Sequence, residues 1–181
     1  MTLLQTYRSE TIPALSKELS IANVHMVPKV KKIIVNMGLG EALKDKKIID
    51  KMAEQLALIT GQKPKVTRAT KSISAFKLRA GMPIGLKVTL RGKRMYEFLE
   101  RLIKIVLPRV RDFRGINAGT FDGHGNISIG FSEMIVFPEV NFESLDKIRG
   151  LEVVIVTTAT DDKQGKVLLE KMGMPFQKHT G

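Results

Sequence analysis

Residues 84–91 alternate between apolar and polar side chains, and this pattern limits the fold more than any other part of the sequence. The apolar set has even numbers and the polar set odd numbers: Ile84, Leu86, Val88 and Leu90 against Lys87, Thr89 and Arg91. A period of two is typical of a strand with one buried side and one side facing solvent. Strands of a doubly wound parallel sheet are covered on both faces and read as continuous apolar runs. The alternation therefore favours a sheet with one open face.

Four segments predict helices: residues 3–20, 45–60, 93–108 and 161–173. In the two clearest, apolar residues recur every three or four positions. They are Ile48, Ile49, Met52, Leu56 and Ile59 in the first, and Met95, Phe98, Leu99, Leu102, Ile103 and Val106 in the second, which ends at Pro108. In 3–20 we expect Leu4, Tyr7, Leu15 and Leu19 to be buried. Pro13 either kinks that helix or starts a second one.

Further strands are expected between these helices. Residues 27–38 have a period of two, with Ile33, Val35 and Met37 on one side. The other expected extended segments are 64–69, 120–131 around an Asp-Gly turn, 133–140 and 151–159. This order predicts an α+β fold: a mostly antiparallel sheet with helices packed on one face and the other face partly exposed. We expect one domain, residues 1–181, with a protruding loop at about 71–83.

The composition favours a polyanionic partner. Lysine and arginine number 30 and aspartate and glutamate 18, which gives a formal net charge of +12. Such a field attracts nucleic acid or an acidic membrane surface. The chain has no cysteine, which excludes disulfides and thiol nucleophiles and is compatible with a reducing compartment. No apolar run approaches the length of a membrane span, so we expect a cytoplasmic protein that does not bind membranes.

The region between Glu54 and Glu97 contains no acidic residue. Its cations are Lys63, Lys65, Arg68, Lys71, Lys77, Arg79, Lys87, Arg91, Lys93 and Arg94. The alternation puts Lys87, Thr89 and Arg91 on one surface, and Lys65 and Thr67 join them if Val66 faces inward. Cations and hydroxyls on a rigid sheet suit contacts to phosphates and ribose 2′-hydroxyls. The alternative is a solvated charged face, but such faces usually carry both signs of charge.

Residues 70–83 are polar, contain glycine and lack apolar periodicity, which predicts an exposed loop. Lys71, Lys77 and Arg79 extend its basic surface beyond the sheet. Phe76 has two possible roles. It stacks on a base, or, as a lone loop aromatic more often does, it anchors the loop to the body of the protein.

Nucleotide-binding loops are not indicated. Gly38 and Gly40 follow a strand, but Leu43 stands where the third glycine of a dinucleotide fingerprint belongs. Six residues separate Gly85 from Gly92, too many for a phosphate-binding loop. We therefore expect no cofactor.

Catalytic and metal-binding patterns are also incomplete. Ser74 and Lys77 form an S-x-x-K pattern without the companion motifs of that enzyme class. The histidines are far apart in sequence and fit no metal-ligand spacing. Asp122 and His124 lie in a predicted turn, and a hydrolytic or RNA-modifying enzyme would have to use them without an identifiable nucleophile. We expect neither an enzyme nor a metal site, and a general polyanion binder stays open as an alternative to a specific RNA-binding protein.

Six runs of sequence resemble one known family closely. They are VPKVKKIIVNMGLGEA, TGQKPKVTRATKSISAFKLRAGMPIGLKVTLRG, RMYEFLERLIKIVLPRVRDFRG, FDGHGNISIGF, FPEV and TTATDD. Together they cover nearly the whole chain, in order and without large gaps. The sequence is similar to the bacterial form of the fifth protein of the large ribosomal subunit.

The resemblance implies a structural ribosomal protein of the central protuberance, located on the ribosome in the cytoplasm. Its implied partners are 5S rRNA, large-subunit rRNA, P-site tRNA, neighbouring 5S-binding ribosomal proteins and a protein of the small-subunit head. Family contacts with 5S rRNA correspond to Asn36, Gly38, Gln62, Lys63, Thr67, Lys87 and Thr89, and the charge pattern adds Lys65, Arg68 and Arg91. The tRNA-facing loop corresponds to Lys71, Ser72, Ser74, Phe76, Lys77, Arg79 and Gly81.

The bridge to the small subunit is assigned to Arg109, Arg111 and Arg114 and, loosely, to residues 132–146. Two residues depart from the family pattern. Thr70 and Ser132 stand where a basic residue is common, so one phosphate contact and one bridge contact are in doubt.

Overall fold

The computed structural model of the protein describes residues 2–177 except 44, 46 and 141–146. The chain divides into two compact units. The first unit contains the residues up to Ile33, Arg91–Ile129 and the residues from Val154 onward, and the second contains Ile34–Leu90 and Gly130–Val153. Among the described residues, none of the helices combines the length and the apolar character that a membrane crossing needs.

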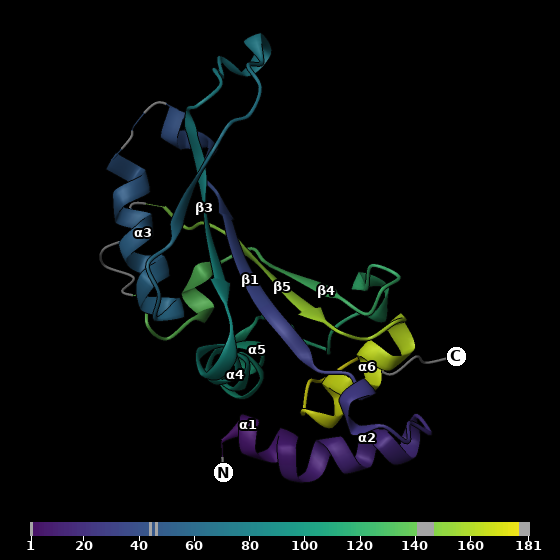
Figure 1. Ribbon diagram of the computed structural model, residues 1–181. Coiled ribbons are helices and arrows are strands. Elements are labelled where there is room, and N and C mark those ends of the chain that lie inside the picture. The colour runs from purple at the N-terminus through teal and green to yellow at the C-terminus, as the bar shows by residue number, and fades with distance from the viewer. Residues whose placement is uncertain (1, 44, 46, 141–146, 178–181) are drawn as a thin grey trace. The chain divides into compact units, whose positions relative to one another are not determined.

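A five-stranded antiparallel sheet in the order β2-β3-β1-β5-β4 is the framework of the fold (Figure 1). Its strands are β1 Val30–Gly38, β2 Lys65–Arg68, β3 Pro83–Leu90, β4 Ile127–Phe131 and β5 Leu151–Thr157. This sheet and its helices confirm the predicted α+β class. In β1 the alternation is also confirmed, because Ile33, Val35 and Met37 are fully buried.

The pairing of β2 with β3 determines which side chains share a face. Val66 lies opposite Leu86, which is fully buried, so Val66 projects from the same side of the sheet as Leu86, although it is itself only half-buried. On the other side of the pair, Lys65 lies opposite Lys87 and Thr67 lies opposite Gly85. Residues directly opposite each other project from the same side of a sheet. The predicted alternation is therefore confirmed for β3, and the pairing puts Lys65 and Thr67 on its exposed side, although Val66 and Thr67 are both half-buried.

Helix α3 (Lys47–Thr60) packs against β3 (Figure 1). Its side chains Met52, Leu56 and Ile59 are buried, as the periodicity of residues 45–60 predicts. A short turn, η3 (Gly40–Leu43), precedes the helix and also contacts β3. Since Leu86, Val88 and Leu90 of β3 are buried, Lys87 and Thr89 between them lie on the side away from α3.

Two helices of the first unit contain a π-helical turn that ends two residues before a proline. One is formed by α1 (Leu3–Thr6), η1 (Tyr7–Thr11) and α2 (Ile12–Glu18), and the other by α4 (Gly92–Arg101), η5 (Leu102–Val106) and α5 (Leu107–Arg109). Pro13 and Pro108 follow these π turns. A proline lacks an N–H and crowds the carbonyl four residues back, and the wider turn lets the helix continue through it.

The π turn also moves the buried stripe of the N-terminal helix. Leu3, Tyr7, Thr11 and Leu15 are buried, at every fourth position. The predictions for Leu4 and Leu19 were wrong, because both are only half-buried. A π turn adds a residue to the helical repeat, so the 3.6-residue period used for the prediction is too short here. Burial raises the pKa of Tyr7 to about 12, and its hydroxyl donates to the carbonyl oxygen of Pro28 at 3.0 Å.

The prediction of an extended segment at residues 133–140 was also wrong. Residues Met134–Val136 form a 3₁₀ turn, η7, and Met134 and Phe137 are buried. In a 3₁₀ turn residues three apart lie on one side, so this conformation buries both side chains together, which a strand would not.

The remaining elements are short turns and one capped helix. The turns are η2 Val24–Met26, η4 Ser74–Phe76 and η6 Ala118–Thr120. Helix α6 (Asp162–Lys171) confirms the predicted C-terminal helix with acidic residues at its start. Asp161 caps it, accepting a hydrogen bond from the backbone N–H of Gln164 at 2.8 Å.

Candidate nucleic-acid interface

An open hollow of about 760 Å³ lies on the side of β2 and β3 away from α3. Besides Val66, it is lined by seven residues that the sequence predicted for RNA contact: Gln62, Lys63, Lys65, Thr67, Arg68, Lys87 and Thr89. We call these seven residues the candidate face. All of them belong to the second unit. The fold thus brings together side chains that are up to 27 positions apart in sequence.

The centre of the candidate face is a pair of like charges. Lys65 and Lys87 are directly opposite each other on neighbouring strands, and both are exposed. Like charges in this arrangement destabilise a sheet, by up to about 1 kcal/mol. Among the described residues, no carboxylate forms an ion pair with either lysine. The folded protein therefore keeps a repulsion that a bound anion would remove.

Gly85 allows β1 and β2 to approach this part of β3. A Cβ atom at Gly85 would lie 2.6 Å from the Met37 carbonyl oxygen and 3.0 Å from Thr67 Oγ1. It would also lie 3.6 Å from the Cα atom of Gly38, which places Gly38 next to the candidate face. The sequence did not single out Gly85 for this role, although a glycine inside an alternating strand is a signal of close approach. Asn36, two residues earlier on β1, is half-buried.

Gln62 is held in place by the strand beside it. Its side-chain Nε2 donates to the carbonyl oxygen of Thr89 at 3.3 Å. The hydroxyl of Thr60, at the end of α3, donates to the carbonyl oxygen of Leu56 at 2.7 Å and accepts from the backbone N–H of Gln62 at 3.4 Å. These bonds fix the amide at one edge of the hollow, where its oxygen stays available as an acceptor.

Arg68 has a structural contact as well as a predicted one. Its Nη1 donates to the carbonyl oxygen of Gly81 at 2.9 Å, across the base of the loop that joins β2 to β3. Arg91, the remaining predicted contact, is exposed at the N-cap of α4. It belongs to the first unit and is therefore not included in the candidate face.

The loop between β2 and β3 continues the hairpin beyond the strands (Figure 1). Ile73 and Leu78 pair through two backbone hydrogen bonds, and Gly81 and Ala69 are also hydrogen-bonded. The hydroxyl of Ser72 accepts a bond from the N–H of Ala80 at 2.9 Å. The loop is exposed, as predicted. Its own hydrogen bonds hold its shape.

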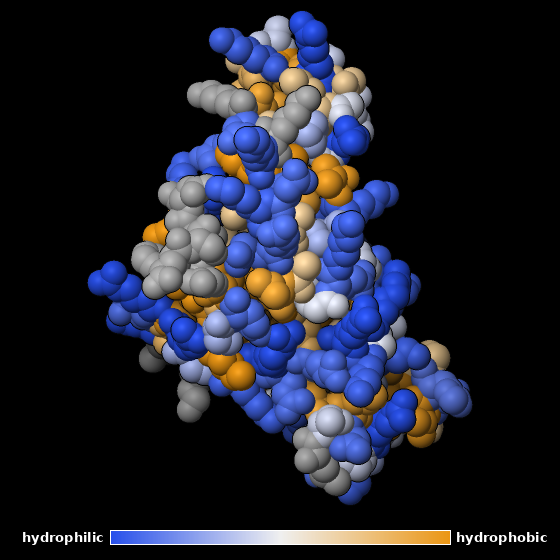
Figure 2. All heavy atoms as spheres, turned by 90° about the vertical axis from the view of Figure 1, so that its left-hand side faces the viewer, coloured by the Kyte–Doolittle hydropathy of each residue, from blue (hydrophilic) through white to orange (hydrophobic). Residues whose placement is uncertain are grey.

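The loop displays both apolar and cationic side chains at its surface. Phe76 is 70% exposed and Ile73 is 44% exposed. Figure 2 shows orange atoms among blue ones on the loop at the top of the view. An open hollow of about 600 Å³ is lined by Ser72, Ser74, Lys77, Leu78 and Arg79. An aromatic ring so exposed does not anchor the loop to the body, and stacking on a base stays a prediction.

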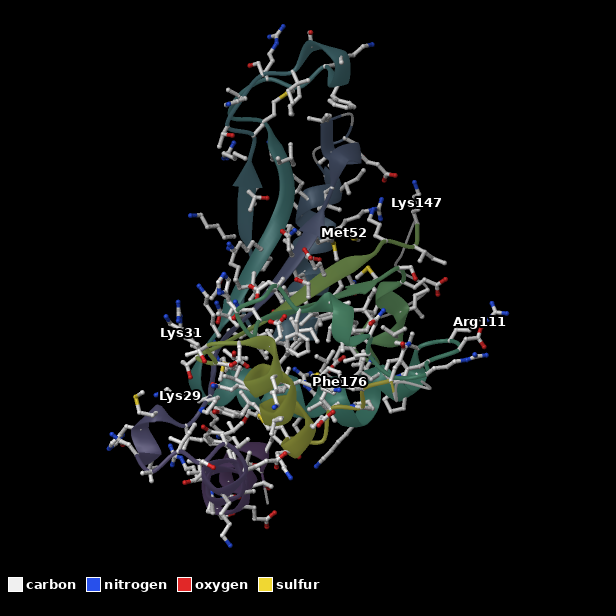
Figure 3. All side chains as sticks on the ribbon, turned by 90° about the vertical axis from the view of Figure 1, so that its right-hand side faces the viewer. Lys29, Lys31, Met52, Arg111, Lys147 and Phe176 are labelled. Carbon is white, nitrogen blue, oxygen red and sulfur yellow. The ribbon has the colours of Figure 1, made fainter. Side chains whose placement is uncertain are left out.

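The predicted bridge residues lie at the surface of the first unit. Arg109, Arg111 and Arg114 are all exposed, at the end of α5 and just after it. Figure 3 shows Arg111 pointing away from the ribbon. In the second predicted segment, Ser132 is exposed, and residues 141–146 lie outside the described residues.

An acidic side chain elsewhere in the second unit, Glu41, has cationic partners. Glu41 accepts hydrogen bonds from Lys147 and from Arg149, the latter at 3.0 Å between Nη2 and Oε2. The bond from Lys147, with the one from Arg149, lowers the pKa of the Glu41 carboxyl. The unit therefore accommodates a carboxylate where cations surround it, but the candidate face has none.

The Asp122 carboxylate stabilises the turn that contains His124. Asp122 Oδ1 accepts hydrogen bonds from the backbone N–H groups of His124 and Asn126, at 2.9 and 3.1 Å. Its Oδ2 accepts from the side-chain amide of Asn126 at 2.7 Å, which is the main cause of the lowered pKa of Asp122. The predicted turn is confirmed, and this carboxylate is used in holding it. Among the described residues, no group of three or more His, Asp or Glu side chains is placed to hold a metal ion.

Comparison with known proteins decides the family. The family model for ribosomal protein L5 matches residues 23–79, and the model for the C-terminus of the same family matches residues 83–176. The chain belongs to the ribosomal protein L5 family. Its members are ribosomal proteins and not enzymes, which agrees with the structural role of Asp122.

Curated relatives cover nearly the whole chain. Proteins named large ribosomal subunit protein uL5 are 57% identical in Roseiflexus sp. (strain RS-1) and 54% identical in Synechococcus sp. (strain RCC307). The first alignment covers 97% of both chains, and the second covers 99% of this chain and all of the relative. The relative from Streptococcus thermophilus (strain CNRZ 1066) is 53% identical over 97% of this chain and 98% of its own.

Proposed function

We propose that this ribosomal protein is a structural constituent of the large subunit that binds 5S rRNA through the candidate face. The observation that carries the proposal is the opposed pair Lys65 and Lys87, exposed at the centre of a hollow without a carboxylate. Phosphates of a folded RNA relieve this repulsion, and the nearby hydroxyls of Thr67 and Thr89 suit ribose 2′-hydroxyl groups.

The β2–β3 loop is proposed to contact P-site tRNA. Its cations Lys71, Lys77 and Arg79 are exposed, and they suit the sugar-phosphate backbone. Phe76 offers a ring face for stacking on an unpaired base. The internal hydrogen bonds of the loop support this role because an ordered loop loses less conformational entropy on binding.

The exposed arginines Arg109, Arg111 and Arg114 are proposed to bridge to a protein of the small-subunit head. Guanidinium groups suit carboxylates at such an interface. We also propose that the protein is bound to the ribosome in the cytoplasm, where it lies in the central protuberance beside other 5S-binding proteins. A single domain stays our prediction for the chain.

The test is binding of the purified protein to 5S rRNA and to a structured competitor RNA of equal length, over a salt series. Counterion release is nearly blind to sequence, so a shaped site keeps a preference of about 4 kcal/mol or more for 5S rRNA at high salt. Equal affinities that fall together with salt would instead indicate a general polyanion binder. Lys87→Ala lowers the salt slope by about 0.9 if its phosphate contact exists, and several such variants without effect would reject the candidate face.

A further inference from the structure

A second acid-free stretch of the chain lies in the first unit. No aspartate or glutamate occurs between Glu18 and Glu41. The part of this stretch that belongs to the first unit contains the turn η2 and the beginning of β1. Of the predicted RNA contacts, only Arg91 lies in the same unit.

The turn η2 presents a small apolar ridge to solvent. Val24 is 57% exposed and Met26 is 71% exposed. Asn23 holds the turn, because its side-chain Oδ1 accepts a hydrogen bond from the N–H of His25 at 2.9 Å. Val27 and Pro28, the next two residues, are buried and anchor the ridge. The exposure of Val24 and Met26 is thus a property of a fixed turn.

Two lysines follow this ridge on one side of the strand. Lys29 and Lys31 are exposed while Val30 between them is buried, so both side chains project from the side opposite Val30. Figure 3 shows the two lysines near each other at the left of the view. The backbone of Lys29 is fixed by Thr158: its N–H donates to Thr158 Oγ1 at 3.0 Å, and its carbonyl accepts from the Thr158 N–H at 2.9 Å.

Several carboxylates of the first unit are engaged elsewhere. Glu18 pairs with Lys171 at 2.9 Å. Asp161 caps α6, and Asp162 accepts hydrogen bonds from Gly123 and Gly125. Among the described residues, Lys29 and Lys31 form no ion pair. The two cations are therefore positioned by the backbone and left without a counter-charge.

We propose that residues Asn23–Lys31 form a second RNA-binding surface, which contacts a double-helical RNA segment through its backbone. Two residues along a strand span about 6.8 Å. A nucleic-acid duplex carries one negative charge per about 1.7 Å of its axis, so both lysines meet phosphates at once. Val24 and Met26 lie beside them against the sugar edges of the shallow minor groove. RNA is chosen over an acidic peptide or membrane because the chain is a ribosomal protein, and in this choice the inference rests on the proposed function.

The test uses a short RNA duplex and the full chain in a salt series. Lys29→Ala/Lys31→Ala lowers the magnitude of the salt slope by about 1.8, which corresponds to two phosphate contacts. The matched control is Lys17→Ala/Lys163→Ala, which removes two exposed lysines of the same unit that have acidic neighbours in sequence. The control changes the slope by less than half as much. Met26→Ser weakens binding a few-fold without changing the slope, because it removes no charge.

The two proposals fail separately. The Lys65→Ala/Lys87→Ala variant should keep part of its binding to the RNA duplex. This remaining binding should be lost when Lys29→Ala/Lys31→Ala is added. Equal slopes for Lys29→Ala/Lys31→Ala and the control, in either background, would overturn the second surface. The second surface would also be overturned if Lys29→Ala/Lys31→Ala left RNA binding unchanged but lost binding to anionic vesicles or to an acidic peptide. If Lys65→Ala/Lys87→Ala leaves 5S rRNA binding intact, the candidate face fails, whatever Asn23–Lys31 does.

Discussion

The β2–β3 loop and the turn of residues 121–127 are both exposed connections that contain glycine, but they satisfy their backbone groups differently. In the turn, Asp122 and Asp162 accept hydrogen bonds from backbone N–H groups, including those of Gly123 and Gly125. In the loop, a serine hydroxyl accepts from Ala80 and an arginine donates to Gly81. This protein therefore does use carboxylates to hold a turn. Their absence from the loop and the candidate face is not a requirement of folding, and it points to a polyanionic partner.

The largest loss of stability is expected from adding a side chain at Gly125, in the turn of residues 121–127. Gly125 has φ +74°, and a Cβ there would lie 2.6 Å from the Ala159 Cβ and 2.8 Å from the Asp161 carbonyl oxygen. Gly125→Ala should lower the free energy of unfolding by roughly 3 kcal/mol or more, from backbone strain and overpacking together. Gly81→Ala is the matched control, because φ is +86° but nothing lies within 4 Å.

Gly81→Ala should cost only the left-handed conformation, about 1–2 kcal/mol. Urea unfolding of both variants measures the difference. Equal losses of unfolding free energy would show that packing around Gly125 does not distinguish the turn of residues 121–127 from the β2–β3 loop.

A smaller effect is expected from Asp122→Ala, and it depends on pH. The pKa of Asp122 is lowered in the folded protein from 3.8, mainly by the hydrogen bond from Asn126. The charged carboxylate therefore contributes stability above pH 4, which is lost as the pH falls through the folded pKa. At pH 7 the variant should be less stable by about 1 kcal/mol, from the lost turn hydrogen bonds.

The difference between the wild type and Asp122→Ala should shrink as the pH falls below 4. Thermal unfolding at pH 7 and pH 3 measures it. A difference that is constant between these pH values would contradict the assigned role of the carboxylate.

In the loop, Ser72→Ala should act locally. The variant removes the acceptor of the Ala80 N–H, so that amide should exchange several-fold faster, equivalent to about 1 kcal/mol of opening free energy. Global stability should change by less than about 0.5 kcal/mol, since Ser72 is exposed. Hydrogen exchange followed by NMR separates the two effects, and Ser74→Ala, a neighbouring exposed serine, is the control. Unchanged exchange at Ala80 would show that the loop is not held by this bond.

The alternation of residues 84–91 was enough to predict that Lys87 and Thr89 share an exposed side of the sheet, because one period of two separates them from Leu86 and Val88. The register was not accessible from sequence. That Lys65 lies opposite Lys87, and not one residue away, depends on the loop length and on the bulge between Thr67 and Arg68. The exposure of Phe76 was equally open, since a ring in a loop packs or protrudes according to contacts far away in sequence.

Other failures have a shared cause. The helical period of 3.6 misplaced Leu4 and Leu19 because it does not allow for π turns, although Pro13 and Pro108 were a signal that the helices needed one. At residues 133–140, apolar content suggested a strand, but Met134 and Phe137 are three apart and a tight turn buries both. In each case a local conformation outside the regular periods decided the burial.

The most direct test of the central claim is Lys87→Glu. It replaces the like-charge pair with an opposite-charge pair across Lys65, so the free energy of unfolding should rise by a few tenths of a kcal/mol. The same change places a carboxylate on the candidate face, so affinity for 5S rRNA should fall by roughly a hundredfold or more at low salt. Lys163→Glu, at an exposed site in the first unit, should change that affinity much less. A Lys87→Glu protein that is destabilised, or that keeps its affinity for 5S rRNA, would contradict the account.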